Sequence, residues 1–230
     1  MYLSRLRLNP TRRDARRLVG SPQAMHAAVM GSHHPESSSN PAGRVLWRLD
    51  NYASHDLQLY VVSPSRPDFT GLLEQAGWPT QISWDTTNYA AFLANIDDGQ
   101  SWSYRLTANP VRVLARDSAS VTGRGKVSPH LTVGQQQAWL AKHSHTWGFS
   151  LPADDNFGVE TEVRERHTAS FGRQDPSEAG RRASVSLTRA TFKGVLTVTD
   201  PEALRSALTL GMGRAKAYGC GLMTLAPPPR

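Results

Sequence analysis

This 230-residue sequence contains very little cysteine and no long hydrophobic run. Cys220 is the only cysteine, which excludes an intrachain disulfide and a zinc site made of cysteines, and is compatible with a reducing cytoplasm. No window approaches the roughly 18 apolar residues that a membrane span needs. The first residues show neither an apolar segment nor a cleavage site typical of a signal peptide. We therefore expect a soluble cytoplasmic protein with no membrane partner.

The sequence also lacks the motifs of several enzyme classes. It contains no serine–histidine–aspartate order, no cysteine–histidine pair and no paired acidic motif. The carboxylates that a two-metal nuclease requires are scattered along the chain. Neither nucleotide fingerprint fits, because a dinucleotide loop needs Gly-x-Gly-x-x-Gly and a triphosphate loop needs Gly-Lys-Ser/Thr. We expect no cofactor and no metal.

Positive charge, by contrast, is concentrated at one end of the chain. Lysine and arginine number 26 against 19 acidic residues, for a formal net charge of +7. In the first twenty residues the arginines are opposed only by Asp14. Phosphate neutralisation with counterion release is the usual role of such a cluster, and a solvated face that aids solubility is the alternative. The candidate RNA contacts here are Arg12, Arg13, Arg16 and Arg17.

A glycine-rich stretch near the C-terminus, residues 211–221, brackets Arg214 and Lys216 with two Gly-x-Gly pairs. Glycine permits positive φ and lets a phosphate or another backbone approach closely, and the two cations suit a polyanion. This pattern makes nucleic acid the expected partner. A helix C-cap at Gly211 and a bulge at the entry of the next strand are the structural alternatives. The candidate RNA contacts here are Gly211, Gly213, Arg214, Lys216, Gly219 and Gly221.

Among eight histidines, His26 has the most suggestive surroundings. It follows the arginine cluster, on an expected helix that begins at Ser21-Pro22 and carries Met25 and Val29. A histidine with a pKa near neutrality beside a bound phosphate can perform acid–base chemistry on a phosphodiester. A purely structural or surface histidine is the alternative. If the protein catalyses a reaction, metal-free transesterification of RNA fits these residues best.

Hydrophobic periodicity and turn residues predict an α+β protein. Each half approximates the order strand–helix–strand–strand–helix–strand, which is the ferredoxin-like order also used by RNA-recognition motifs. We therefore predict two tandem ferredoxin-like domains (βαββαβ, RRM-like), at 1–95 and 96–230, with the C-terminal glycine-rich loop in the second. The expected strands are 2–8, 45–49, 57–62, 101–114, 159–168, 182–190, 191–198 and 222–226. An arginine-rich helix is expected after Asn9 or Thr11, either of which can cap it. The other expected helices are 22–30, 67–75, 132–146 and 201–210.

Other stretches are expected to be loops or resist assignment. Residues 31–43, 115–129 and 169–180 are polar or rich in glycine, and we expect exposed connections there. Residues 80–99 show no clear pattern. The aromatic strand that stacks bases in RNA-recognition motifs is absent, so base stacking on the sheets is not predicted.

Four segments in the right order resemble one known family. The glycine-rich stretch with the following Leu222–Pro227 is the most specific, and 1–4, 105–111 and 192–200 complete the likeness. Over nearly its whole length the chain resembles the CasE (Cse-type) endoribonucleases of type I-E CRISPR systems. The resemblance implies a tandem ferredoxin-like fold that cuts the repeat hairpins of precursor RNA. It also implies that the product stays bound and that the protein joins the Cascade surveillance complex of antiviral defence.

The resemblance carries one catalytic residue onto this chain, because the family's histidine matches His26. Many relatives carry a tyrosine where this chain has Gln23, and some carry a lysine where it has Gly31. The partner of His26 is therefore open, with a nearby arginine, His33 or His34 as candidates. The implied reaction is metal-independent attack of the ribose 2′-OH on the adjacent phosphorus, leaving a 2′,3′-cyclic phosphate and a 5′-OH, with His26 as base or acid.

An A-form repeat stem must be recognised through its shape and backbone. An expected hairpin over residues 163–183 is rich in arginine and could reach into the RNA groove, and an ordinary exposed hairpin is the alternative. A non-catalytic RNA-binding or scaffold subunit of a ribonucleoprotein remains the competing function. The candidate RNA contacts of the hairpin are Arg164, Arg166, Arg173, Arg181 and Arg182.

Overall fold

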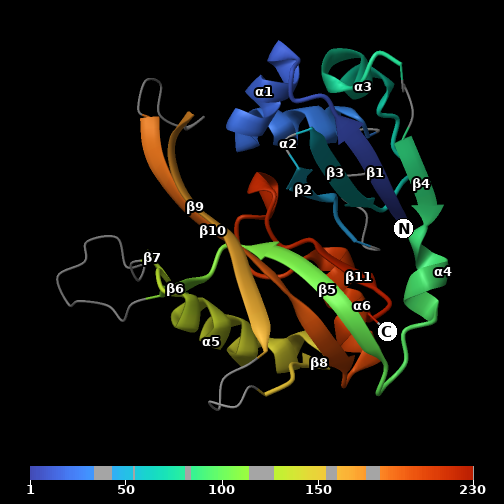
Figure 1. Cartoon of the computed structure of the whole chain (residues 1–230), viewed down its shortest axis with the longest axis vertical. Coiled ribbons are helices and arrows are strands. Elements are labelled where there is room, and N and C mark those ends of the chain that lie inside the picture. The colour runs from blue at the N-terminus through green and yellow to red at the C-terminus, as the bar shows by residue number, and fades with distance from the viewer. Residues whose placement is uncertain are drawn as a thin grey trace.

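The computed structural model consists of two large antiparallel sheets with helices packed against them, one above the other in Figure 1, and a small two-stranded sheet. The N-terminal half of the chain forms one of the two large sheets, and the C-terminal half forms the other. The structure describes residues 1–33, 43–53, 55–80, 84–113, 127–153, 160–174 and 182–229. Within this part of the chain no helix has the length and apolar character needed to cross a membrane.

The N-terminal half forms a four-stranded sheet in the order β2-β3-β1-β4. Every adjacent pair is antiparallel, and β1 lies between β3 and β4. This is the strand order of a ferredoxin-like fold, as predicted. Its elements are β1 (Tyr2–Leu8), α1 (Arg13–Gly20), α2 (Pro22–Gly31), β2 (Leu46–Ala53), β3 (Asp56–Ser63), α3 (Thr70–Ala76), β4 (Trp84–Asn88) and α4 (Tyr89–Ala94).

Local capping explains where the first two helices begin. The Ser21 hydroxyl accepts the N–H of Ala24 at 3.2 Å and Pro22 occupies the first turn, so the predicted start of α2 is confirmed. The predicted caps of α1 are wrong. The Asn9 side chain instead accepts the N–H and hydroxyl of Thr11, at 3.0 and 2.7 Å, in a turn before the helix.

The core of this half lies between the sheet and helices α1, α2 and α3. Alternate residues of β1 are buried, as the period of two predicts, with Leu6 and Leu8 fully enclosed. Met25 and Val29 of α2 and Leu72 of α3 belong to the same cluster. One face of the sheet is thus covered by helices, and the other is left for the C-terminal half.

The C-terminal half repeats the same arrangement. Its sheet has the order β11-β5-β10-β8, and β9 also pairs with β10. The second strand of this ferredoxin-like unit is therefore split into β8 and β9. Its elements are β5 (Ser101–Ala108), β6 (Val111–Val113), β7 (Val127–Pro129), α5 (Val133–Ser144), η2 (His145–Trp147), β8 (Phe149–Ser150), β9 (Thr161–Gln174), β10 (Arg182–Val198), α6 (Pro201–Leu210), η3 (Lys216–Tyr218) and β11 (Met223–Ala226).

Three predictions for this half were wrong. Residues 127–129, the end of an expected connection, form strand β7 and pair with β6. The predicted strands 182–190 and 191–198 are one strand, β10, because pairing with β5 runs unbroken across the expected division. A register shift between Arg189 and Thr191 is absorbed only on the side of β9. Residues 169–174, expected as part of a turn, continue β9 by pairing with β10. The hairpin arms are therefore long, and in Figure 1 they rise to the height of α1.

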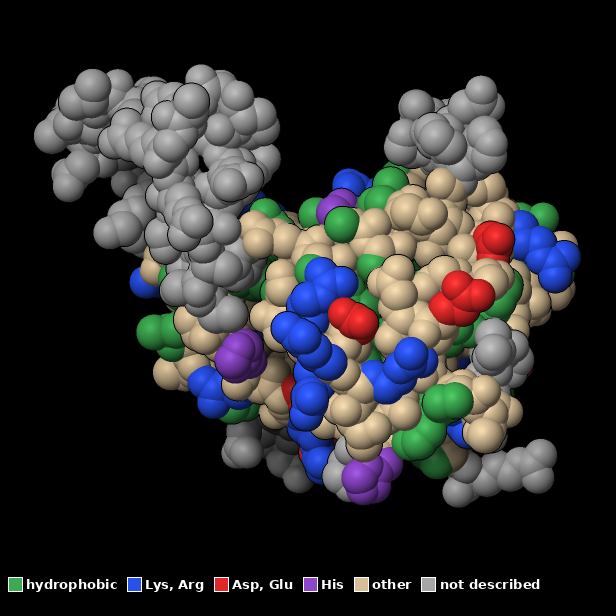
Figure 2. Space-filling model, turned by 90° about the horizontal axis from the view of Figure 1, so that it is seen from above, with side chains coloured by type: hydrophobic (Ala, Val, Ile, Leu, Met, Phe, Trp, Pro, Cys, Tyr) green, Lys and Arg blue, Asp and Glu red, His purple; other side chains and the backbone are tan. Residues whose placement is uncertain are grey.

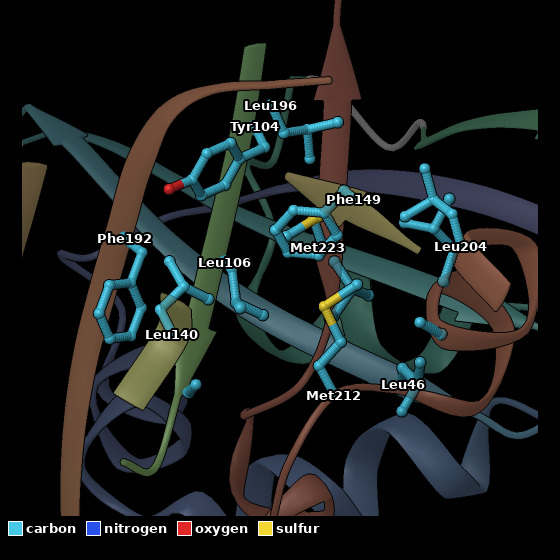
Figure 3. Close-up of a cluster of buried hydrophobic side chains, with 14 of the residues drawn as sticks. Leu46, Tyr104, Leu106, Leu140, Phe149, Phe192, Leu196, Leu204, Met212 and Met223 are labelled. Carbon is cyan, nitrogen blue, oxygen red and sulfur yellow. The ribbon is translucent and has the colours of Figure 1, made fainter. Parts of the chain in front are cut away.

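The two halves share one hydrophobic cluster. Leu46 of β2 and Val62 of β3 lie on the helix-free face of the first sheet and pack with side chains of the second, including Leu106 and Met223. Figure 3 shows Leu46 among residues of the C-terminal half, with Met212 nearby. The two sheets are thus joined by continuous apolar packing.

A buried ionic network reinforces this junction. Asp50 is fully buried and accepts two bonds of 2.8 Å from the Arg48 guanidinium, and Arg105 Nε lies 3.2 Å from the same carboxylate. Arg105 also pairs with Glu165 of β9 at 2.9 Å. Arg48 donates to the carbonyls of Arg105 and Leu222, at 2.6 and 3.1 Å. The Asp50 carboxylate therefore neutralises the enclosed Arg48 and shares the neutralisation of Arg105 with Glu165.

We predict that Asp50→Ala lowers the free energy of unfolding by about 3–5 kcal/mol, because it leaves the buried Arg48 guanidinium without its anion and Arg105 with Glu165 alone. Equilibrium unfolding in urea, followed by far-ultraviolet circular dichroism, measures the change. Asp85→Ala is the matched control, because Asp85 pairs with Arg5 at an exposed position and such pairs contribute at most about 1 kcal/mol. Equal effects of the two substitutions would contradict the assignment of Asp50 to the junction.

Candidate active site between α2 and the glycine-rich loop

Helix α2 presents His26 at the surface by anchoring its other face. Met25 and Val29 are buried one turn apart, whereas His26 is only half-buried. Gln23 lies three positions before His26, and residues at that spacing share a helix face. Gln23 and His26 accordingly line the same cleft.

The glycine-rich loop, residues 211–221, connects α6 to β11 and folds back against α2 and β2. Its central turn, η3, contacts both elements. The N–H of Tyr218 donates to the carbonyl of Ala215 at 2.9 Å and closes this turn. Five residues of the loop have positive φ: Gly211, Gly213, Ala215, Gly219 and Gly221.

Close packing explains why glycine is needed at two of these positions. A Cβ on Gly219 would lie 2.6 Å from the Trp47 ring, and one on Gly221 would lie 2.6 Å from the carbonyl of Met212. The N–H of Gly221 donates to Thr107, and that of Gly211 donates to Ala207, which makes Gly211 a helix C-cap. These two amides serve the fold, and Arg214 and Lys216 supply the cationic side chains that the loop brings to the cleft.

A cleft of about 610 Å³ opens where the loop meets α2 and the segment before β2. Arg44 enters it from that segment, which is held by a bond of 3.2 Å from the Arg44 N–H to the Thr209 carbonyl. Among the residues described, the lining contains no carboxylate. It consists of Gln23, His26, Arg44, Gly213, Arg214, Ala215, Lys216, Ala217 and Tyr218.

The surroundings of the cleft lower the pKa of two of its titratable groups, His26 and Lys216. Burial is the main reason that the pKa of His26 lies below 6.5, and the charge of Arg44 adds to it. The same two causes lower the pKa of Lys216 from its ordinary 10.5. At neutral pH the imidazole is therefore uncharged and able to accept a proton.

The two ring nitrogens of His26 differ in their surroundings. Nδ1 is enclosed, and no described residue forms a hydrogen bond with it. A ligand in the cleft can therefore reach the ring only through Nε2. This geometry leaves Nε2 as the atom that would exchange a proton with a substrate.

The arginines of α1 form a separate basic surface. Arg13, Arg16 and Arg17 are exposed, and Arg17 lies 3.5 Å from Asp14. Arg12 precedes the helix and donates to the carbonyl of Gly77 at 3.2 Å, so part of its role is structural. Figure 2 looks onto this side of the molecule and shows lysine and arginine side chains gathered near its centre.

The hairpin arginines are only partly described. Arg164 pairs with Glu162 and Arg166 donates to the Leu131 carbonyl, although both side chains are exposed. In the β9–β10 ladder the backbone of Arg173 lies opposite Ala183, and that of Arg182 lies opposite Gln174. Side chains of residues 169–186 and all of Arg181 lie outside what the structure describes.

The structure separates His33 from His26. His33 is buried, its Nδ1 lies 2.8 Å from the Val29 carbonyl, and its ring meets Phe69 edge-on. It does not line the cleft. His34 falls outside the described residues. Within the described residues, no cluster of histidine, cysteine and carboxylate side chains could hold a metal ion.

Sequence analysis did not identify Arg44 or Tyr218 as site residues. Arg44 is an isolated arginine just before a strand, and it reaches the cleft only because β2 lies beside the end of α6. Tyr218 lies inside the glycine-rich stretch, in which only the glycines and the two cations, Arg214 and Lys216, were predicted to bind RNA. Its position two residues after Lys216 was the sequence feature that could have indicated a place in the same site.

Comparison with known proteins places this chain within one family. A family model described as "CRISPR associated protein" matches residues 1–227. The CRISPR-associated endoribonuclease Cse3 of Thermus thermophilus is 29% identical over 228 residues, covering 99% of this chain and 100% of that protein. The Cascade subunit CasE of Escherichia coli is 26% identical over 205 residues, covering 79% and 94%.

A solved structure supports the same relation. Thermus thermophilus Cse3, bound to an RNA representing a pre-cleavage complex, superposes with a TM-score of 0.77 and 27% identity, and 98% of each chain is covered. The match thus extends over both sheets and the loop between α6 and β11. The chain belongs to the family of CRISPR-associated proteins.

Proposed function

We propose that this chain is an endoribonuclease that cleaves the repeat hairpins of CRISPR precursor RNA. The observation that carries this proposal is the cleft in which an uncharged, half-buried His26 faces Arg44, Arg214 and Lys216. Full-length similarity to an endoribonuclease, Cse3, supports it. A cleft with one proton acceptor and several cations suits cleavage of a phosphodiester.

The proposed reaction begins with the ribose 2′-OH of the cleavage nucleotide. His26 Nε2 accepts its proton as the 2′-oxygen attacks the adjacent phosphorus. The bond from phosphorus to the 5′-oxygen then breaks, leaving a 2′,3′-cyclic phosphate and a 5′-OH. The lowered pKa of His26 favours its role as general base over that of general acid.

The cations around the cleft stabilise the charge that develops on the phosphoryl oxygens. Arg44 and Arg214 present fixed positive charges that need no proton transfer. The described lining contains no carboxylate, the ligand type that Mg²⁺ prefers, and its cations repel a metal ion. We therefore propose a metal-independent reaction.

Substrate binding uses surfaces outside the cleft. The α1 arginines and the β9–β10 hairpin would hold the backbone of the repeat stem, whose A-form groove is recognised by shape. We propose that 1–95 and 96–230 act as two ferredoxin-like units on one RNA. The relative CasE is a Cascade subunit, which supports assembly of this chain into such a complex. We further propose that the product stays bound and that the protein acts in the cytoplasm.

A non-catalytic RNA-binding subunit is the second candidate. It is favoured by Gln23, which faces the cleft where many members of the resembling family carry a tyrosine. An amide side chain neither accepts nor releases a proton near neutral pH. The two functions differ in whether the purified protein converts a repeat hairpin into a discrete product.

We predict that the wild-type protein cuts a labelled repeat hairpin in excess chelator and that His26→Ala reduces the single-turnover rate by about 10²–10⁴-fold. RNA affinity should be nearly unchanged, because the stem contacts lie elsewhere. His145→Ala, at an exposed position on η2, is the control. Gel analysis of product and filter-binding affinity measure the two effects.

A substrate with 2′-deoxyribose at the cleavage nucleotide should bind and remain intact, because it lacks the attacking oxygen. Cleavage of this substrate, or loss of wild-type cleavage in chelator, would contradict the proposed chemistry. Absence of cleavage by the wild-type protein under all conditions would favour the scaffold function.

The pH dependence of the rate tests the assignment of His26 as base. The active form is the neutral ring, so the rate should fall as pH decreases from about 7 to about 5, through a pKa below 6.5. The other titratable or charged side chains in the cleft are Arg44, Arg214, Lys216 and Tyr218. A single-turnover profile that rises toward acid pH would show that the protonated ring is the active form.

Replacing Arg164, Arg166, Arg173 and Arg182 by alanine should weaken binding of the repeat hairpin and reduce the slope of log affinity against log salt. Each phosphate contact that is lost lowers the number of counterions released when the RNA binds. Arg66→Ala, at an exposed position outside these surfaces, is the control for the loss of one cation. Unchanged affinity and slope in the fourfold variant would assign the hairpin another role.

A further inference from the structure

Lys216 is held in the cleft by the glycine-rich loop itself. A Cβ placed on Gly211 would lie 3.2 Å from Lys216 Cδ, and one on Gly221 would lie 3.3 Å from its Cγ. The aliphatic stem of Lys216 therefore runs past both glycines, whose missing side chains leave it room. A lysine packed in this way has few rotamers, so its ammonium group is directed rather than mobile.

The backbone before Lys216 also holds an uncommon conformation. Ala215 has φ of 61°, a left-handed geometry that is unfavourable for an L-residue with a side chain. The bond from the Tyr218 N–H to the Ala215 carbonyl, 2.9 Å long, maintains it. Such strain is kept when the surrounding structure fixes it, and here it orients η3 toward α2.

The surroundings of Lys216 suit a group that releases a proton. The side chain is half-buried, Arg44 lies close enough to lower its pKa, and no described carboxylate forms an ion pair with it. An ammonium group whose charge is disfavoured is a stronger acid than one in water. Arg44 cannot take this part, because a guanidinium group stays protonated in proteins.

The proposed reaction requires a second proton transfer that His26 does not supply. As the bond from phosphorus to the 5′-oxygen breaks, that oxygen needs a proton to leave as a hydroxyl. Gln23 cannot provide one. This inference rests on the proposed function and concerns the leaving-group half of the same reaction.

We propose that the Lys216 ammonium group is the general acid that protonates the 5′-oxygen while His26 accepts the 2′-proton. One bond forms, from the 2′-oxygen to phosphorus, and one breaks, from phosphorus to the 5′-oxygen. The 2′-proton passes to His26 and a Lys216 proton passes to the 5′-oxygen. Water then returns both side chains to their starting states.

The test replaces the bridging 5′-oxygen at the cleavage site by sulfur, which leaves as a thiolate without being protonated. Lys216→Met keeps the aliphatic stem between the two glycines and removes the ammonium group. Rates are measured in single turnover at saturating protein, on the oxygen and the sulfur hairpin. Circular dichroism and RNA affinity verify that each variant is folded and binds.

We predict that the Lys216→Met variant cleaves the oxygen substrate about 10²–10⁴-fold more slowly than the wild type. Its rate on the sulfur substrate should lie within about tenfold of the wild-type rate, which corresponds to a barrier change of at most roughly 1.4 kcal/mol. Lys216→Arg should behave in the same way, because a guanidinium restores charge but not acidity. His26→Ala should stay slow on both substrates. Lys142→Ala, which removes an exposed lysine of α5, should match the wild type on both.

Four results would overturn the proposal. The first is cleavage of the oxygen substrate by the Lys216→Met variant at the wild-type rate. The second is equally slow cleavage of the oxygen and sulfur substrates by this variant. Either result would leave Lys216 at most the role of a phosphate contact. Tyr218→Phe could show the sulfur rescue instead, which would make the phenol the acid. Failure of the wild-type protein to cut either substrate would refute the proposed function itself, and this inference with it.

Discussion

A buried carboxylate, Asp50, holds the two halves of this molecule in one arrangement. It lies between two enclosed guanidinium groups, Arg48 from the same strand and Arg105 from the other sheet. Arg48 further donates to the carbonyl of Leu222, the residue that directly follows the glycine-rich loop. Because β2 carries Trp47 under Gly219 and directly follows the segment that holds Arg44 at the cleft, this network fixes the loop against α2. The cleft exists only because the two sheets are joined in this way.

The chemistry of the cleft follows from this arrangement. Enclosure disfavours charge on His26 and Lys216, and Arg44 disfavours it further on both. The proposed base and the proposed acid then lie in the same cleft, one on α2 and one on η3. Tuning two groups by shared surroundings is a common way to perform acid–base catalysis near neutral pH.

Much of the fold could be predicted because its signals are local. The Ser21-Pro22 cap, the alternation of β1 and the Asp200-Pro201 start of α6 each depend on neighbouring residues. The unbroken β10 was missed because pairing with β5 overrides its local pattern. The glycine-rich loop was recognised as special, but its glycines serve close packing against Trp47, Met212 and Lys216 as much as any ligand. Arg44 could not be found, since its place in the cleft depends on contacts between distant segments.

The central claim is that α2 and the glycine-rich loop form one catalytic cleft around a single RNA linkage. A structure of the protein with a 2′-deoxy repeat hairpin tests it most directly. The account predicts that the sugar 2′-position lies beside His26 Nε2 and that the 5′-oxygen lies within about 2.6–3.2 Å of Lys216 Nζ, the reach of a proton transfer. A linkage held on the α1 arginines, away from both groups, would contradict it.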